Sequence, residues 1–395
     1  MPVDDATPPV RWLTAEEATA RLGVSRQTLY AYVSRSRIGA IAAPEDPRRS
    51  LYDAADIRRL SQRNRGGRSR RAVAASTISW GEPILVSAIT RIEGGQLEYR
   101  GQDAIELSAS ATLEEVAALL WQAETMPPAT ASRPWPRARA TTDVAGRCIS
   151  AMAELAMAGR WTGRTDSVLP DAMRILHRLA WAAVGLPGTA ARPSAPVHAA
   201  MASAWGLGPK AADLIRRALV LVADHELNAS TYATRVVAST RAPLGACVLA
   251  GLTALVGPLH GGMTDELRHL LADPLVAADP SAAVALRLAR GEQIPAFGHP
   301  LYPDGDARAR ALLEHLRPPP RVLRLMQAVH NATGIEPNID CALLILEQRL
   351  RLPAGTALAV FAVGRTVGWI AHALEQWRDG ALIRPRAVYP DANIA

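Results

Sequence analysis

Residues 356–377 read Thr-Ala-Leu-Ala-Val-Phe-Ala-Val-Gly-Arg-Thr-Val-Gly-Trp-Ile-Ala-His-Ala-Leu-Glu-Gln-Trp and predict one long, apolar helix. Residues 211–223 and 228–240 also show helical periodicity, and Thr112-x-x-Glu115 is a capping-box pattern that predicts the start of another helix. Strand-like runs are scarce, and residues 96–100 form the best of them. The body of the chain is therefore expected to be mainly α-helical.

Arg365 lies inside this apolar helix, where a guanidinium requires a buried anionic partner. That partner is either a carboxylate side chain or a bound ligand. Four polar clusters interrupt the rest of the apolar body, at residues 224–230, 257–262, 297–299 with 306–308, and 337–340. These clusters and Arg365 are the candidate functional groups.

Each cluster alone has a structural explanation. A lone histidine in an apolar segment is commonly a hydrogen-bonded core residue, and Asp340 after Asn338 fits a helix cap. Together the clusters suit the removal of a proton beside the carbonyl group of a carboxylate substrate. Such chemistry needs a carboxylate base, donors for an enolate oxygen and for an electrophilic carbonyl, and arginines that bind acid groups. Residue spacing alone does not assign these roles.

The charge of the chain is concentrated at its N-terminus. The 395 residues carry a net charge of +7, and 49 % of them are hydrophobic, which indicates a globular protein of two or three domains and excludes wholesale disorder. Residues 1–75 hold 14 Arg against 8 acidic residues, whereas the other 320 hold 30 basic and 29 acidic residues. A small basic module therefore precedes a nearly neutral body. Only Lys210 among the 44 basic residues is a lysine, a bias that genomic base composition also produces.

The cysteines and the apolar runs indicate a cytoplasmic protein. Three cysteines stand far apart without metal-ligand spacing, which argues against disulfides and structural zinc. Residues 1–10 hold two acids and three prolines and do not form a signal peptide. The uncharged run 242–264 contains prolines and glycines, so we expect a buried helix followed by a loop rather than a membrane span.

The basic module has the pattern of two short helices. Thr14 and Glu17 form a capping box that opens a helix over residues 15–22, which Gly23 ends. Ser25 then caps a second helix from residue 26 to about residue 36. A strand-like piece follows at 48–52, and Asp53 caps a further helix. This order is that of a helix-turn-helix, whose second helix can enter a DNA major groove.

The module resembles the winged helix-turn-helix of MerR and excisionase-type proteins through residues 22–30 and through Arg49-x-Leu51-Tyr52-x-x-x-Asp56-Ile57. The resemblance implies a winged helix-turn-helix domain at 1–62 and a basic linker at 63–76, with double-stranded DNA as partner. The candidate DNA contacts are Arg26, Gln27, Thr28, Tyr32, Arg35 and Arg49. The alternative is a helical module that packs on the body or on a protein partner.

The body resembles the citrate synthase family over about residues 85–390. The motifs that carry this likeness are Ile92-Glu93-Gly94-Gly95-x-Leu97-x-Tyr99-Arg100-Gly101, Asp224-His225-Glu226-x-Asn228-Ala229-Ser230, Gly257-Pro258-x-His260-Gly261-Gly262, Gly298-His299, Asn338-x-Asp340, Gly368-Trp369-x-Ala371-His372-x-x-Glu375-Gln376 and Ile383-Arg384-Pro385-Arg386. The resemblance implies an all-helical body at 77–395, in which a smaller domain at roughly 261–345 is inserted in the large one and closes over the substrates.

By this resemblance, Asp340 is the base that takes a proton from acetyl-CoA, His260 is the neutral donor to the enolate oxygen, and His299 polarises the carbonyl of oxaloacetate. A helix start after His260 would favour its neutral form. His225, Arg308 and Arg365 match the set that holds carboxylates, and Arg384 matches an arginine that reaches into the neighbouring subunit's site. A homodimer is therefore implied, with no metal and no cofactor beyond the acyl-CoA co-substrate.

Four departures from the family pattern concern the acyl-CoA. Pro303 stands where family members commonly have a basic residue that meets a CoA phosphate. Ala307 replaces the proline of Asp-Pro-Arg, Cys341-Ala342-Leu343 follows the base, and Thr264-Asp265 replaces Ala-Asn. These changes bear on acyl-CoA affinity and substrate choice rather than on the reaction type.

The leading hypothesis is an acyl-CoA:oxaloacetate C-acyltransferase of the tricarboxylic acid cycle type, which makes citrate or 2-methylcitrate. The rival is a DNA-binding regulator whose synthase-like body senses an acyl-CoA or a dicarboxylate. A third possibility is the reverse, citrate-cleaving direction. The sequence does not separate acetyl-CoA from propionyl-CoA, because one methylene is worth only about 1–3 kcal/mol.

Overall fold

The computed structural model describes residues 12–22, 26–34, 38–43, 46–54, 56–57, 85–124, 126, 143–159, 168–186 and 195–386. The chain forms two compact units, Met1–Val86 and Ser87–Ala395. The predicted linker at 63–76 lies outside the described residues.

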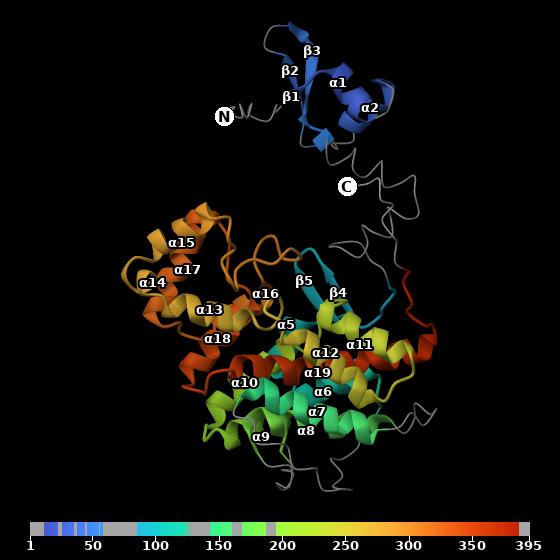
Figure 1. Ribbon diagram of the computed structural model, residues 1–395, viewed down its shortest axis with the longest axis vertical. Helices are drawn as coiled ribbons and strands as arrows, with labels where there is room; N and C mark the ends of the chain where they lie inside the picture. Colours follow the sequence, from blue (N-terminus) through green and yellow to red (C-terminus); the bar gives the residue numbers. More distant parts are fainter. Residues whose placement is uncertain are drawn as a thin grey trace, which may run out of the picture. The chain divides into compact units, whose positions relative to one another are not determined.

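The N-terminal unit combines two helices with a small antiparallel sheet (Figure 1). Its elements are β1 (Trp12–Leu13), α1 (Ala15–Leu22), α2 (Arg26–Ser34), β2 (Ala40–Ala43) and β3 (Asp46–Asp53), with strand order β1-β3-β2. Ala40 pairs with Tyr52, and the register shifts between Ala42 and Ala43. The unit has its own core of Leu13, Ala18, Leu22, Leu29, Ile38, Tyr52, Ala54 and Ile57.

The structure confirms most local predictions for this unit. The Thr14 backbone donates to Glu17 Oε2 at 2.8 Å, and the Glu17 backbone donates to Thr14 Oγ1 at 3.3 Å, so the capping box at the start of α1 is present. Helix α2 is described as far as Ser34, the expected end near residue 36 lies outside the described residues, and the strand-like piece lies within β3. Gly23 and Ser25, predicted to end and begin the two helices, lie outside the described residues.

The body is mainly helical, as expected. It opens with an antiparallel hairpin of β4 (Thr90–Glu93), β5 (Gln96–Tyr99) and the short β6 (Gln102–Asp103). Its helices are α5 (Ala104–Ser110), α6 (Leu113–Trp121), α7 (Val144–Ala158), α8 (Val168–Val184), α9 (Val197–Ala204), α10 (Pro209–Leu221), α11 (Ala229–Ser239), α12 (Leu244–Leu255), α13 (Met263–Ala272), α14 (Pro274–Ala278), α15 (Pro280–Ala289), α16 (Ala307–Leu313), α17 (Pro320–Thr333), α18 (Ile339–Arg349) and α19 (Thr356–Asp379).

Helix α19 runs through the centre of the body, packed against α6, α8, α10, α11, α12 and α18 (Figure 1). Every side chain from Thr356 to Leu374 is buried. The helix is long and apolar enough to cross a membrane, and here the body covers it on all sides. Gly364 and Gly368 bring its backbone close to α10 and to the turn that follows α10. A Cβ atom on Gly368 would lie 2.2 Å from Asp224 Oδ1.

The predictions for the body helices are also confirmed. Thr112 and Glu115 form the expected capping box at the start of α6. Asn228 caps α11, and its Oδ1 accepts the Thr231 backbone N–H at 3.0 Å. The uncharged run 242–264 is the helix α12 followed by a turn. The three cysteines are free and buried.

Helices α13, α14, α15 and α17 lie together at one side of the body (Figure 1). Ser87–Ala395 nevertheless forms one compact unit. An inserted smaller domain at about 261–345 therefore stays a prediction.

Candidate active site

The candidate catalytic groups come from turns and helix starts that lie far apart in the sequence. His225 lies in the turn between α10 and α11, His260 in the turn between α12 and α13, and His299 in the loop before α16. Asp340 lies in the first turn of α18, and Arg365 in the middle of α19. The fold brings these elements together in the body.

His225 and His299 are direct neighbours. Their rings meet edge to face with centroids 4.9 Å apart, and both pack against the ring of Tyr302. The His299 Nδ1 accepts the Leu301 backbone N–H at 3.2 Å, so the proton of the neutral ring is on Nε2. Burial, reinforced by Arg308, lowers the pKa of His299 to about 4. His299 is therefore a neutral ring at neutral pH.

His260 belongs to a polar cluster with α11 and α19. Its Nε2 lies 2.9 Å from Ser230 Oγ, which also lies within donating distance of Asn228 Oδ1, at 2.7 Å, and accepts from Trp369 Nε1 at 3.2 Å. Burial and then Arg365 lower the pKa of His260 to about 4. The helix start that the sequence led us to expect is present, because α13 begins at Met263 with Gly262 as its N-cap.

Asp340 is not the cap of α18. Asn338 is the N-cap, and its Oδ1 accepts the Asp340 backbone N–H at 3.0 Å. The Asp340 carboxylate is thereby left free, and its buried Oδ1 has no hydrogen-bond partner among the described residues. Burial raises the pKa of Asp340 to about 7 against the opposing effect of Arg308. A carboxylate with a pKa near 7 is suited to act as a general base.

Asn338 also joins Asp340 to the His299 loop. Its Nδ2 donates to the Gly298 carbonyl at 3.1 Å, and its backbone N–H donates to the Ala296 carbonyl at 3.1 Å. Gly298 has φ +71°, a left-handed conformation in which a glycine is favoured. The base and His299 are therefore held by one shared set of hydrogen bonds.

Arg308 already has a carboxylate partner. Its Nε and Nη2 donate to the two oxygens of Asp306 at 3.0 and 2.8 Å, and both side chains are buried. Asp306 Oδ2 also accepts the Ile339 backbone N–H at 3.0 Å, which fixes the start of α18 next to Asp340. Burial favours the uncharged forms of both side chains, but the ion pair between them has the larger effect. The pKa of Arg308 is therefore raised and the pKa of Asp306 is lowered.

Arg365 has a buried guanidinium that forms no ion pair with any residue that the structure describes. The side chain is 1 % exposed, its Nε donates to the Val222 carbonyl at 2.8 Å, and its Cζ lies 4.9 Å from the Phe361 ring centroid. Its Nη2 has no hydrogen-bond partner in the part of the chain that the structure describes. Burial lowers the pKa of Arg365 to about 10, while the charge of Asp224 opposes this. The guanidinium can therefore still bind a carboxylate.

Asp224 is the nearby carboxylate, and other groups hold it. Its Oδ2 accepts from Thr90 Oγ1 at 2.6 Å and lies 3.2 Å from His372 Nε2. Burial acts to raise the pKa of Asp224, but the effects of His372 and Arg365 outweigh it. The pKa is therefore below its usual value, and the carboxylate remains ionised. The carboxylate thus compensates the charge of Arg365 without a direct ion pair between them.

Sequence reasoning did not identify three groups of this site, which are Tyr302, Phe361 and Ser230. Phe361 contacts both the His260 ring, at 6.1 Å between centroids, and Arg365. Ser230 lay inside one of the polar clusters, but Tyr302 and Phe361 have the appearance of ordinary core aromatics. Only the three-dimensional contacts distinguish them.

The remaining predicted residues stand apart from this cluster. Arg384 follows α19, is exposed, and forms no hydrogen bond or ion pair with a residue that the structure describes. Thr28 and Tyr32 are half-buried on α2 of the N-terminal unit. Arg26 and Gln27 lie in α2 and Arg49 in β3, but their side chains are outside what is described, as is the whole of Arg35.

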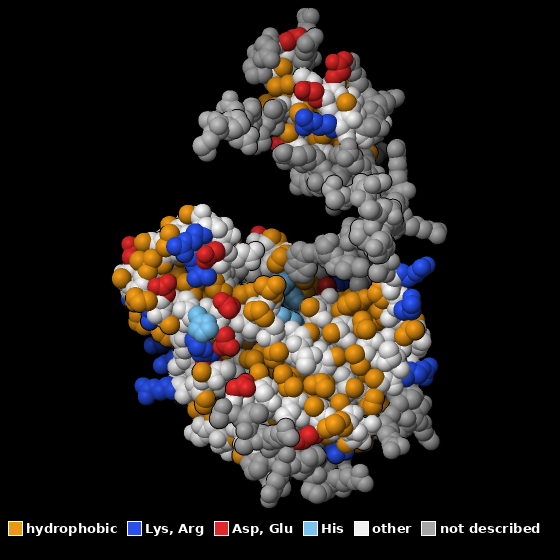
Figure 2. Space-filling model, viewed as in Figure 1, with side chains coloured by type: hydrophobic (Ala, Val, Ile, Leu, Met, Phe, Trp, Pro, Cys, Tyr) orange, Lys and Arg blue, Asp and Glu red, His pale blue; other side chains and the backbone are white. Residues whose placement is uncertain are grey.

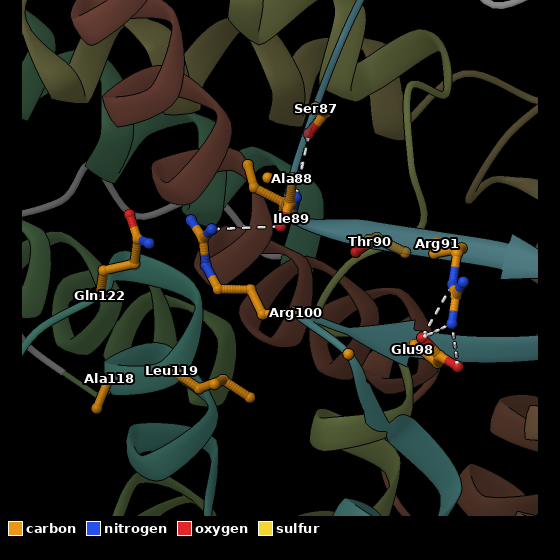
Figure 3. A pocket seen from close by; sticks show the side chains of 11 residues that line it. Ser87, Ala88, Ile89, Thr90, Arg91, Glu98, Arg100, Ala118, Leu119 and Gln122 are labelled. Carbon is orange, nitrogen blue, oxygen red and sulfur yellow. Dashed lines mark hydrogen bonds and ion pairs between the residues drawn. The ribbon is translucent and has the colours of Figure 1, made fainter.

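A hollow of about 740 Å³ lies elsewhere, between the β4–β5 hairpin and α6 (Figure 3). The Arg91 guanidinium in it is paired with Glu98 at 2.7 Å, and Arg100 donates to the carbonyls of Leu120 and Ala88. Neither the histidines nor Asp340 line it. Because both arginines are already engaged, this hollow lacks the features of the catalytic site.

A family model described as "Citrate synthase, C-terminal domain" matches residues 78–386. The chain belongs to the citrate synthase family. A protein of Mycobacterium tuberculosis named "Putative citrate synthase 2" is 32 % identical over 330 residues, which cover 75 % of this chain and 87 % of that protein. A 2-methylcitrate synthase of the same species is 29 % identical over 351 residues, covering 78 % and 88 %.

The solved structures give the same result for the fold. The citrate synthase of Thermotoga maritima aligns with a TM-score of 0.63 and 27 % identity, over 80 % of this chain and 95 % of that chain. The predicted citrate synthase-like helical fold is therefore confirmed, and the protein is a citrate synthase-type enzyme. The family match begins at residue 78, beyond the core of the N-terminal unit.

Asp340→Asn should stabilise this citrate synthase family member in a pH-dependent way. The pKa of Asp340 is about 7 in the folded protein against an ordinary 3.8, so the folded state binds this proton more tightly. The wild type therefore loses free energy of unfolding as the pH rises from about 4 to about 7, whereas the variant does not. We expect urea unfolding to show the variant more stable by about 1–3 kcal/mol at about pH 8, and equal near pH 4.

Asp265→Asn is the matched control, since its side chain is 52 % exposed. It should show no such pH-dependent gain. If Asp340→Asn gained the same free energy of unfolding at both pH values, a raised pKa of Asp340 would be contradicted.

Proposed function

We propose that this protein condenses an acyl-CoA with oxaloacetate and releases CoA, forming citrate from acetyl-CoA or 2-methylcitrate from propionyl-CoA. The observation that carries the proposal is the combination of a carboxylate with a pKa near 7, two neutral histidines, and a buried arginine that pairs with no carboxylate in the described part of the chain. Relatives named citrate synthase and 2-methylcitrate synthase support both acyl donors.

Asp340 starts the reaction by taking a proton from the carbon beside the thioester carbonyl. His260 donates a hydrogen bond to the enolate oxygen that develops. The Ser230 hydroxyl has one proton and two neighbouring acceptors, Asn228 Oδ1 and His260 Nε2. When it donates to Nε2, the ring proton is on Nδ1, which then serves as the donor.

The second half of the reaction forms the carbon–carbon bond. His299 donates through Nε2 to the ketone oxygen of oxaloacetate, whose carbonyl carbon the enol carbon attacks, and that oxygen becomes the product hydroxyl. Water then cleaves the thioester and releases CoA. Arg365 and Arg308 hold the carboxylates of oxaloacetate, together with His225. The side chains named here supply this chemistry without a metal or an organic cofactor.

A thiol-release assay tests the proposal. Wild-type protein should release CoA from acetyl-CoA or propionyl-CoA only when oxaloacetate is present. Asp340→Asn should lower kcat by about 100- to 10,000-fold, because loss of a general base typically has an effect of this size. The exposed Asp171→Asn on α8 is the control and should keep the wild-type rate. If a folded wild-type sample released CoA no faster than the background without enzyme, the synthase function would be ruled out.

We further propose a cytoplasmic homodimer formed through the outer face of α11 and α12. The partly exposed side chains of this face carry no charge; they are Tyr232, Ala233, Val236, Val237, Ala246, Leu249, Ala250, Thr253 and Ala254. Hydrophobic side chains gather over these two helices in Figure 2. An uncharged face of this extent is typical of homodimer interfaces. In the dimer, the exposed Arg384 would complete the active site of the partner subunit.

Mixing two inactive variants tests this sharing of a site. Arg384→Ala and Asp340→Asn should each be inactive alone. In a mixed dimer, the subunit that keeps Asp340 receives Arg384 from its partner, so one site of two is complete. Because half of the randomly reassembled dimers are mixed, about a quarter of the wild-type activity should return. Co-purification of an untagged Asp340→Asn subunit with a tagged Arg384→Ala subunit controls for exchange, and no recovery despite exchange would place Arg384 outside the partner's site.

A second candidate function, DNA binding, rests on the N-terminal unit. This unit has a core of its own, two consecutive helices and a three-stranded antiparallel sheet, and residues 1–75 carry a net charge of +6. We propose that it is a winged helix-turn-helix that places α2 against double-stranded DNA. If the full chain bound DNA and released no CoA thiol, it would be a regulator that senses acyl-CoA or a dicarboxylate.

Binding of the full chain to a fluorescent DNA duplex, measured over a salt series, tests the second candidate. Affinity should fall steeply with salt, with a slope of about −0.9 in log–log form for each phosphate contact. Arg26→Ala combined with Arg35→Ala should reduce this slope, whereas Arg317→Ala with Arg324→Ala on the body should not. Absence of binding at low salt would make the unit a protein-docking module.

A further inference from the structure

Tyr302 joins three groups that are predicted to bind oxaloacetate. It lies in the loop between His299 and α16, and its side chain is 2 % exposed. Its hydroxyl lies 3.0 Å from His225 Nε2, its ring centroid lies 5.2 Å from that of His299, and Arg308 Cζ lies 5.2 Å from the same centroid. No other polar contact of the hydroxyl is found in the described part of the chain.

His225, the partner of this hydroxyl, is a neutral ring. It is 6 % exposed, and the charged or titratable groups around it are Arg308, Arg365, His299 and His260. Burial, followed by the two arginines, holds the pKa of His225 well below its usual range. A neutral imidazole has a single N–H, so only one of its two nitrogens can donate a hydrogen bond.

The hydroxyl of Tyr302 decides which nitrogen donates. The phenol proton needs an acceptor, and His225 Nε2 is the only one within reach among the described residues. If Nε2 carried the ring proton, the phenol proton would be left without an acceptor in a buried place, which is unfavourable. The phenol therefore donates to Nε2, and the proton of His225 is on Nδ1. Nδ1 has no hydrogen-bond partner in the described chain and is not fully buried.

We propose that Tyr302 is a positioning residue, which fixes His225 in the Nδ1–H form so that a neutral ring donates to a carboxylate of oxaloacetate. This inference rests on the proposed function, since it concerns the same substrate. A phenylalanine here would keep the ring contacts but leave both forms of His225 accessible. In the Nε2–H form, the Nδ1 lone pair would face the carboxylate and repel it.

Oxaloacetate binding to Tyr302→Phe, measured by calorimetry on the full chain without acyl-CoA, tests the proposal. At about pH 8, the Kd should rise about tenfold, the size expected for one hydrogen bond to a charged group. A loss of similar size is expected at about pH 6, because burial and the two arginines keep His225 neutral at both pH values. The KM for acyl-CoA should stay within about twofold, since this substrate does not meet His225.

Tyr99→Phe is the matched control. Its buried hydroxyl contacts the carbonyls of Val220, Leu221 and Asp224. Its loss should affect stability without a change in oxaloacetate affinity. An unchanged oxaloacetate Kd in Tyr302→Phe would overturn the proposal. If wild-type protein did not bind oxaloacetate at all, the proposed function would fail, and this inference with it.

A direct measurement avoids any dependence on how the variant folds. In wild-type protein with ¹⁵N-labelled histidine, nitrogen chemical shifts separate the two neutral forms. His225→Asn identifies the signal by its absence. We expect the Nδ1–H form, and an Nε2–H form would overturn the assignment.

Discussion

The close approach of α19 to the turn that follows α10 is the constraint on which the site depends. The Gly368 backbone donates to the Ala223 carbonyl at 3.0 Å, and any side chain at Gly368 would collide with Asp224. This contact places Arg365 of α19 beside His225 of the turn. It also buries Asp224, whose carboxylate is held by Thr90 from the hairpin and by His372 from α19. Three separate elements are thereby fixed around one buried charge.

The arginines of the body show how differently one residue type can be used. Arg216 donates to carbonyls at the end of α5, Arg100 to one at the end of α6, and Arg147 to two near the end of α8. In these places a guanidinium satisfies carbonyls that the helix leaves open. Among the residues that the structure describes, Arg365 donates to a single carbonyl, and its Nη2 has no hydrogen-bond partner. Composition and net charge cannot separate these uses, because they depend on the partners that the fold supplies.

The sequence predicts the helices and the polar clusters well, since both are local. Capping at Thr112 and periodicity along α19 depend on neighbours a few residues away. The grouping of His225 with His299 depends on contacts between distant segments, and only the family resemblance pointed to it. Tyr302 and Phe361 could not be found, because a buried aromatic that holds a histidine has the same local pattern as one that only fills the core.

The electrostatics of the site also required the fold. The sequence suggested that a helix start favours the neutral form of His260, and only the fold shows that burial and Arg365 also lower its pKa. The same arginine lowers the pKa of Asp340, against the burial that raises it. Arg365 therefore favours neutral donors and an ionised base at once. Because Arg365 has no direct ion pair among the described residues, its unpartnered Nη2 is available to a carboxylate substrate in the function proposed above. Binding such a substrate should then stabilise the same arrangement that performs the reaction.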